Sequence, residues 1–295
     1  MTNVLGTKLP LIQGALAQIS TPPLVAAVAK AGGLGVLTTT DLTAADLAQA
    51  VAEVRAQTDQ PFAVNLMLQQ PNIAELLTYL LAHPVPAVTT SAGSPKHFAA
   101  QLQSVGTKVI AVIPNVKVAV KMQALGVDAL VAEGLESGGH IGTETTLSLV
   151  QAVVNAVDLP VFAAGGIIDA RGVAAMEALG AVGVQVGTAF LAAAETPIAD
   201  AYKQAVIDAG DTSTVVTGQE MGDAVRCLQN PLTQDYFAQV AQGASADALH
   251  KLLDGSLSRA IAGDVAHGTL MAGQIASQVH AIEPVAKIVA RLYPA

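Results

Sequence analysis

The stretch VFAAGG (161–166), followed by IIDARGVAAMEALGAV (167–182) and GVQVGTAFL (183–191), decides the fold. Two short apolar runs flank a segment with helical spacing, and Gly180 lies where a helix-ending glycine is expected. Both runs are continuously apolar rather than alternating in polarity, which predicts strands buried on both faces. The stretch therefore predicts two parallel strands joined by a helix.

The same unit recurs along the chain. The other apolar runs are LPLIQGA (9–15), LGVLTTT (34–40), FAVNLML (62–68), PAVTTS (86–91), KVIAVIP (108–114) and ALVAEG (129–134). Helical spacing follows the runs, with Thr21 and Thr43 as expected N-caps and Gly32, Gly106 and Gly126 as expected helix ends. Eight such units, each close to the roughly 30 residues of a barrel unit, predict an α/β fold of the (β/α)8 TIM-barrel class.

A doubly wound open sheet is the structural alternative. That fold predicts a GxGxxG phosphate-binding turn after the first strand. The first strand here ends in QGALAQ (13–18), which lacks this fingerprint. The barrel is therefore the better prediction.

The regular pattern ends near residue 210. We expect a barrel over 1–210, a small helical insertion or cap over the barrel mouth at 211–270, and closing helices at 271–295. No low-complexity linker separates these parts, so a freely hinged second domain is not expected.

Composition limits the class of protein. Hydrophobic residues make up 52% of the 295 residues and charged residues 13%, which predicts a large core and subunit contacts, with a homodimer as the expected assembly. A net charge of −9 without a basic cluster argues against nucleic-acid binding. No apolar run is long enough to cross a bilayer, and no signal-peptide pattern opens the chain. Cys227 is the single cysteine, so we expect a cytoplasmic protein without disulfides.

The active face of such a barrel lies at the C-terminal ends of its strands. Those ends carry glycines and small polar residues with hardly a charge, which suits a large hydrogen-bonding ligand. The shortage of carboxylates disfavours a glycosidase pair and a divalent-metal site, so no metal is expected. Gly165-Gly166 and Gly187-Thr188 end adjacent strands, where barrels commonly bind phosphate through backbone N–H groups.

Several motifs together resemble a known superfamily. The series IQGAL, AKAGGLGVL, FAVNLML, AEGLESGGHIG (132–142), VFAAGGI and ALGAVGVQVGTAF is similar to the flavin-dependent nitronate monooxygenase and enoyl-acyl-carrier-protein reductase superfamily. GQEMGDAVRCLQNPLTQDY and GDVAHGTLMAGQIA resemble the reductase branch, the FabK type. The resemblance covers almost the whole chain in colinear order.

This resemblance implies non-covalently bound FMN, with NADH or NADPH as reductant and an enoyl thioester on acyl-carrier protein or CoA as substrate. It implies contacts to the flavin ring and ribityl chain, and others to the phosphate end. The implied residues are, in that order, Gly14, Asn65, Glu133, Gly138 and Gly139, then Gly165, Gly166, Gln185, Gly187 and Thr188; Thr38 and Ser91 are added by strand position. The implied activity is enoyl-thioester reduction in fatty-acid synthesis.

His140 is the expected catalytic residue. Imidazole suits proton transfer near neutral pH, and Gly138 and Gly139 leave room for a ligand beside it. Nitronate oxidation would use the same histidine, so His140 does not distinguish the two reactions. His267 in GDVAHGT is a second candidate near the barrel mouth, and Asp264 is expected to anchor its loop.

The chain also departs from the reductase pattern. QGALAQ stands where reductases of this type usually read QGGMAW, GQEMGD lacks their histidine, and DVAHG replaces an Asp-rich DVDGG. These changes keep two alternatives open: nitronate monooxygenase and a catalytically silent flavoprotein on the same barrel.

Overall fold

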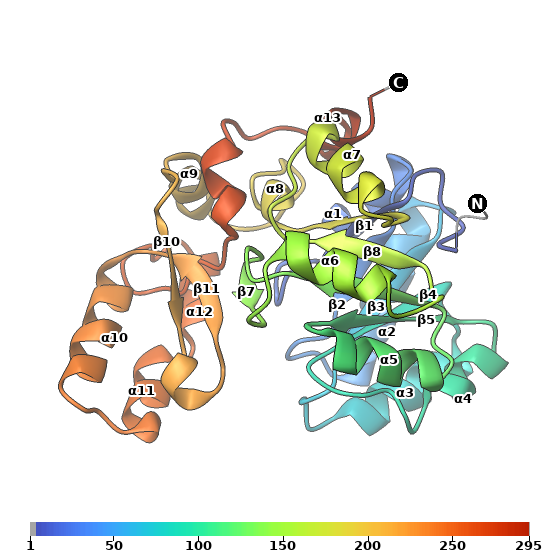
Figure 1. Ribbon diagram of the computed structural model, residues 1–295, viewed down its shortest axis with the longest axis horizontal. Helices are drawn as coiled ribbons and strands as arrows, with labels where there is room; N and C mark the ends of the chain where they lie inside the picture. Colours follow the sequence, from blue (N-terminus) through green and yellow to red (C-terminus); the bar gives the residue numbers. More distant parts are fainter. Residues whose placement is uncertain (1–3, 295) are drawn as a thin grey trace.

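The computed structural model describes residues 4–294. Eight parallel strands form one sheet in the order β1-β9-β8-β6-β5-β4-β3-β2 (Figure 1). The strands are β1 (Leu11–Gln13), β2 (Gly35–Thr38), β3 (Phe62–Met67), β4 (Ala87–Ser91), β5 (Lys108–Ile113), β6 (Ala129–Glu133), β8 (Val161–Ala164) and β9 (Gly183–Val186). Each lies within one of the eight apolar runs. In the last run Gly187 ends the strand, and the rest of GVQVGTAFL forms the short helix α8 (Thr188–Leu191).

The two end strands of the sheet meet and nearly close it. Ile12 of β1 bridges to Leu34, whose N–H donates to the Leu11 carbonyl at 2.7 Å. Oε1 of the buried Gln13 side chain accepts from the Val36 N–H at 3.2 Å, so an amide side chain supplies a bond where the backbone ladder is incomplete. The predicted TIM barrel is confirmed.

Helices alternate with the strands around the outside. They are α1 (Pro22–Lys30), α2 (Ala44–Gln57), α3 (Ile73–Ala82), α4 (Ala99–Ser104), α5 (Val116–Ala124), α6 (Thr146–Val154) and α7 (Ala170–Ala178), followed by α9 (Asp200–Ile207) and, at the chain's end, α13 (Val285–Leu292). α13 packs against both α1 and α7 and so fills the eighth helix position. Within residues 4–294 no helix is long and apolar enough to cross a membrane.

Local signals in the sequence explain where several helices begin and end. Thr43 forms a capping box with Asp46 at the start of α2. Gly32, Gly106, Gly126 and Gly180 all have positive φ, the conformation that favours glycine after a helix. Thr21 precedes α1 as expected, but its hydroxyl makes no capping bond, and Pro22 supplies the helix start instead.

The core has two layers, one on each face of the strands. The barrel interior is filled mostly by small and medium side chains, among them Ile12, Val36, Ala63 and Ala129, and by the larger ring of Phe162. A larger cluster of mostly Val and Leu lies between strands and helices. Burial on both faces is why the strands read as continuous apolar runs.

The segment 211–270 contains strands as well as helices. β10 (Thr214–Thr217) and β11 (Val225–Leu228) pair antiparallel, and β11 also pairs with β7 (Gly139–His140). The short helix η1 (Gln219–Met221) joins β10 to β11, and α10 (Pro231–Ala241), α11 (Ala246–Leu253) and α12 (Ser256–Ile261) follow. Figure 1 shows these elements gathered beside the barrel. β7 lies in the loop after β6, so the small sheet joins this segment to the barrel.

Candidate functional site

A cavity lies at the C-terminal ends of the barrel strands. Its atom-free space, including the open mouth, is about 1110 Å³. His140 and the twelve residues expected to bind the cofactor all line it: Gly14, Thr38, Asn65, Ser91, Glu133, Gly138, Gly139, Gly165, Gly166, Gln185, Gly187 and Thr188. The loops therefore bring together residues from seven of the eight strand ends, which is where a barrel places its ligand.

Backbone donors are concentrated after β8 and β9. Gly165 and Gly166 have φ of +108° and +72°, which favours glycine, and a Cβ at Gly165 would lie 2.6 Å from the Thr146 hydroxyl oxygen. Among the described residues, the N–H groups of Gly165, Gly166 and Gly187 donate to no acceptor. These donors border the cavity, so this end can accept an anionic group.

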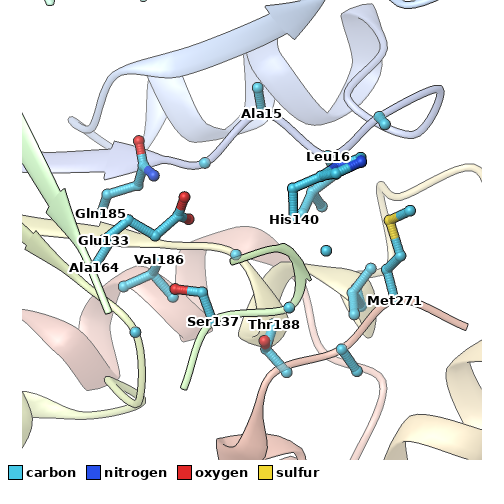
Figure 2. Close-up of a pocket in the computed structure, with 18 of the residues that line it drawn as sticks. Ala15, Leu16, Glu133, Ser137, His140, Ala164, Gln185, Val186, Thr188 and Met271 are labelled. Atoms are coloured by element: carbon cyan, nitrogen blue, oxygen red, sulfur yellow. The ribbon is translucent and has the colours of Figure 1, made fainter. Parts of the chain in front are cut away.

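Neutral polar side chains line one wall of the cavity. Asn65 donates to the Thr89 hydroxyl at 2.9 Å, which fixes the orientation of its amide. The Gln185 amide has no hydrogen-bond partner within residues 4–294 and faces the cavity. Figure 2 shows Gln185 and Glu133 on one side of the cavity and His140 on the other. This wall can hydrogen-bond a flat polar ligand.

Glu133 is the only carboxylate among the cavity-lining residues. It ends β6, and its side chain is only partly exposed at the wall of the cavity. Desolvation raises the pKa of Glu133 to about 7, and a hydrogen bond from Ser137 opposes the shift. The carboxyl group can thus either donate or accept a hydrogen bond near neutral pH.

His140 lies at the junction of two cavities. Through β7 it pairs with Val225 of β11, so the 211–270 segment fixes its backbone. Its ring is about half exposed, with Nε2 3.2 Å from Oδ1 of Asp223. His140 and Met271 border both the strand-end cavity and a second cavity, which Asp41 and the 211–270 segment also line.

The C-terminal segment contributes residues that the sequence did not single out. Met271, Ala272 and Ile275 line the first cavity. A Cβ at Gly138 would lie 2.6 Å from the Ala272 carbonyl carbon, so this glycine is required for backbone packing as well as for space beside a ligand. The stretch GTLMAGQIA (268–276) indicated only a family resemblance, and nothing in it predicted this contact.

A buried arginine ties the same region together. Arg226 of β11 donates from Nε to the Leu135 carbonyl at 2.9 Å and from Nη1 to the Thr214 hydroxyl at 3.1 Å. Leu135 belongs to the loop that carries His140. The side chain is buried, so these two bonds compensate for its desolvation and hold that loop against β11.

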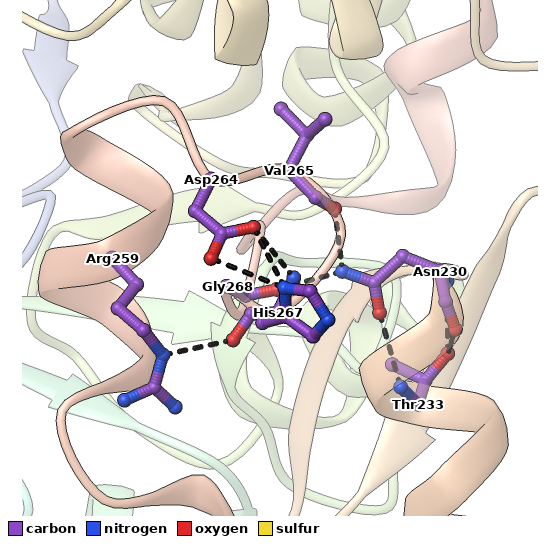
Figure 3. A network of polar contacts seen from close by, with 7 residues as sticks. All are labelled: Asn230, Thr233, Arg259, Asp264, Val265, His267 and Gly268. Carbon is purple, nitrogen blue, oxygen red and sulfur yellow. Dashed lines mark hydrogen bonds and ion pairs between the residues drawn. The ribbon is translucent and has the colours of Figure 1, made fainter.

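His267 lies outside both cavities. Its ring contacts Asp264, whose Oδ1 also accepts from the His267 N–H at 3.0 Å (Figure 3). These hydrogen bonds lower the pKa of Asp264. The structure thus gives Asp264 the anchoring role expected for it, while His267 does not reach the first cavity.

Two other expectations concern cysteine and metals. Cys227 is buried in β11, and desolvation raises the pKa of its thiol to about 12. A buried thiol with a raised pKa is a poor nucleophile near neutral pH. Over residues 4–294, no three His, Cys, Asp or Glu side chains cluster in a way that would hold a metal ion.

Comparisons with known proteins agree on the family. The family model described as nitronate monooxygenase matches residues 1–295. FabK from Thermotoga maritima superposes with a TM-score of 0.95 and is 40% identical, covering 99% of this chain and 93% of that one. Nitroalkane oxidase from Streptomyces ansochromogenes superposes with a TM-score of 0.87 at 31% identity, covering 97% and 95%.

A curated relative has a third kind of name. A hydroxy-methyl-oxo-octahydroindene-carboxyl-CoA dehydrogenase of Mycobacterium tuberculosis is 35% identical over 237 residues, which is 79% of this chain and 67% of that protein. The names differ in substrate, but all describe oxidoreductases. The chain belongs to the nitronate monooxygenase family and is an FMN-dependent oxidoreductase.

Proposed function

We propose that the protein reduces trans-2-enoyl thioesters with electrons from NADH or NADPH. One observation carries the proposal: a second cavity, of about 1470 Å³ with its open mouth, meets the first at His140 and Met271. A small nitronate needs no such space, whereas a thioester carries a long arm on acyl-carrier protein or CoA. The 40% identity to FabK over nearly the whole chain also supports it.

The first cavity fits FMN. The free N–H groups of Gly165, Gly166 and Gly187, with the Thr188 hydroxyl, would hold the phosphate. Other cavity-lining groups would hold the ribityl chain and ring: Gly14, Thr38, Asn65, Ser91, Glu133, Gly138, Gly139 and Gln185. When bound, FMN would accept a hydride from NAD(P)H and deliver it to the β-carbon of the substrate.

The protein's own contribution is a proton and an enclosed site. His140 lies where both cavities meet, so its ring can donate a proton to the α-carbon of a thioester whose arm lies in the second cavity. In this proposal residues 211–270 act as a cap that walls this cavity, and the protein works in the cytoplasm.

The test begins with the purified holoenzyme. We expect NADH oxidation that depends on crotonyl-CoA or a crotonyl acyl-carrier protein, and FMN release on denaturation. His140→Ala should retain FMN but lose at least 100-fold in turnover, because general acid catalysis contributes about 10²- to 10⁴-fold. His267→Ala is the matched control, since His267 lines neither cavity. An equal loss of turnover in His140→Ala and His267→Ala would contradict a catalytic role for His140.

Nitronate oxidation is the second candidate function. The family model and the nitroalkane oxidase likeness favour it, and the first cavity alone can hold a nitronate beside His140. Oxygen uptake with an alkyl nitronate, without enoyl-dependent NADH oxidation, would establish this function instead. Bound FMN with neither activity would support a silent flavoprotein.

A further inference from the structure

Asp223 is the one carboxylate in ion-pair contact with the His140 ring within the described chain. Its Oδ1 lies 3.2 Å from Nε2. Asp223 comes from the 218–223 loop of the 211–270 segment, whereas His140 follows barrel strand β6. The pair thus joins two parts of the molecule at the point where the two cavities meet.

The loop that carries Asp223 is held in place. Gly218 has φ of +80°, its N–H donates to the hydroxyl of the fully buried Tyr236 at 2.8 Å, and its carbonyl accepts from the Asp223 N–H at 2.9 Å. Tyr236 in turn donates to Glu220 at 2.6 Å. The Asp223 carboxylate therefore lies on a turn that these hydrogen bonds hold in place.

The backbone beside Asp223 also fixes the histidine. The Ala224 carbonyl accepts from the Ile141 N–H at 3.0 Å, and Val225 pairs with His140 in the small sheet. Backbone pairing on both sides of the contact limits how far the ring and the carboxylate can separate. The contact is thus a consequence of how β11 meets β7.

Contact with Asp223 distinguishes the two ring nitrogens. A carboxylate accepts a hydrogen bond from Nε2–H, which leaves Nδ1 as the nitrogen that meets substrate. Nδ1 has no partner within residues 4–294. The other ionisable residues that border these cavities form no ion pair with the ring: Glu133 in the first, and Asp41, His250, Lys251 and Asp254 in the second.

We propose that Asp223 is a positioning residue that holds His140 with Nε2 protonated and Nδ1 directed to substrate. This inference rests on the proposed enoyl reduction. In that reaction the β-carbon gains the hydride, the α-carbon gains the proton from Nδ1, and the imidazolium becomes neutral imidazole before solvent reprotonates it. Asp223 keeps the ring oriented throughout, because it accepts the hydrogen bond from Nε2–H in both the imidazolium and the neutral imidazole.

The experiment separates the two half-reactions of the holoenzyme under anaerobic conditions. In Asp223→Asn, the rate of FMN reduction by NADH should stay within about twofold of the wild-type rate, because that step needs no proton from His140. Flavin reoxidation by crotonyl thioester should slow by about 10- to 100-fold, part of what a general acid contributes, with a larger solvent deuterium isotope effect. Asp223→Glu should recover part of the rate. Asp264→Asn, which alters the other Asp–His pair, should change neither step.

A second readout needs no turnover. Nitrogen-15 spectra of histidine-labelled protein, with His140 assigned through His140→Gln, should show the Nε2–H form in the wild type and loss of this preference in Asp223→Asn. Unchanged reoxidation, or slower reoxidation with an unchanged tautomer, would overturn the proposal. A wild type that does not reoxidise with any enoyl thioester would refute the proposed function, and the spectra alone would then decide the role of Asp223.

Discussion

Replacing Glu133 with glutamine should stabilise the flavin-free protein more as the pH rises. Desolvation raises the pKa of Glu133 to about 7 from an unfolded value of 4.5. Between these values the folded chain binds a proton that the unfolded chain has released, so stability falls as pH increases. Below 4.5 the group is protonated in both states, and above 7 it is ionised in both, so its contribution changes only within this window.

The magnitude follows from the shift. The folded and unfolded pKa values differ by about 2.5, which corresponds to about 3 kcal/mol. The wild type loses this free energy of unfolding at about 1.4 kcal/mol per pH unit between pH 4.5 and 7. Glu133→Gln removes the ionisation and keeps nearly the same shape. The stability of the variant minus that of the wild type should therefore rise by about 3 kcal/mol across the window and then stay constant.

Urea unfolding of both proteins at pH 5, 6, 7 and 8 measures this difference. Subtracting the two proteins at each pH cancels the contributions of all other ionisable groups. Glu144→Gln, at an exposed carboxylate of the following loop, is the matched control for removing one negative charge. A Glu133→Gln difference that is the same at pH 5 and pH 8 would refute the reasoning, because it would mean that burial does not disfavour the ionised form.

Two further predictions concern packing and reactivity. Gly138→Ala should lower the free energy of unfolding by about 1–3 kcal/mol and weaken FMN retention, because the new Cβ would overlap Ala272. Thermal unfolding and flavin release measure these two effects. An unchanged Tm would contradict the close contact. Cys227 should resist alkylation by iodoacetamide at pH 8 until the protein is unfolded, because its thiol is buried and burial raises its pKa to about 12. Mass spectrometry of the labelled protein measures the alkylation. Rapid labelling of the native protein would show that the thiol is accessible.

Much of the barrel could be predicted from sequence because its signals are local. Each strand is an apolar run buried on both faces, and glycines such as Gly126 and Gly180 end helices through their own backbone conformation. Gly165 and Gly166 were also found from a local pattern, a glycine pair at a strand end where barrels commonly bind phosphate, and both have positive φ. The position of a residue within a barrel strand also fixes which end of the barrel it faces.

The parts of the fold and of the site that could not be predicted from sequence depend on contacts between distant parts of the chain. Met271 reaches the cavity because the C-terminal segment packs on Gly138, and nothing near Met271 in sequence indicates that contact. β10 and β11 fall in a segment expected to be mostly helical. They are stabilised by pairing with each other and with β7, which is a tertiary effect. Asp223 was hidden for the same reason, since its partner His140 lies in a different part of the chain.

Within the cavity, some residues are positioned by local structure and others by long-range contacts, so the two groups can vary separately within the family. The residues that would hold FMN lie on strand ends and turns, where backbone geometry leaves little freedom. The orientation of His140 depends instead on β11 and on the turn that carries Asp223. In the proposed mechanism, a sequence change in that turn would therefore alter how His140 presents its proton without disturbing the residues proposed to hold FMN. FabK and the nitroalkane oxidase, whose names differ, both superpose on this barrel, as such an arrangement would allow.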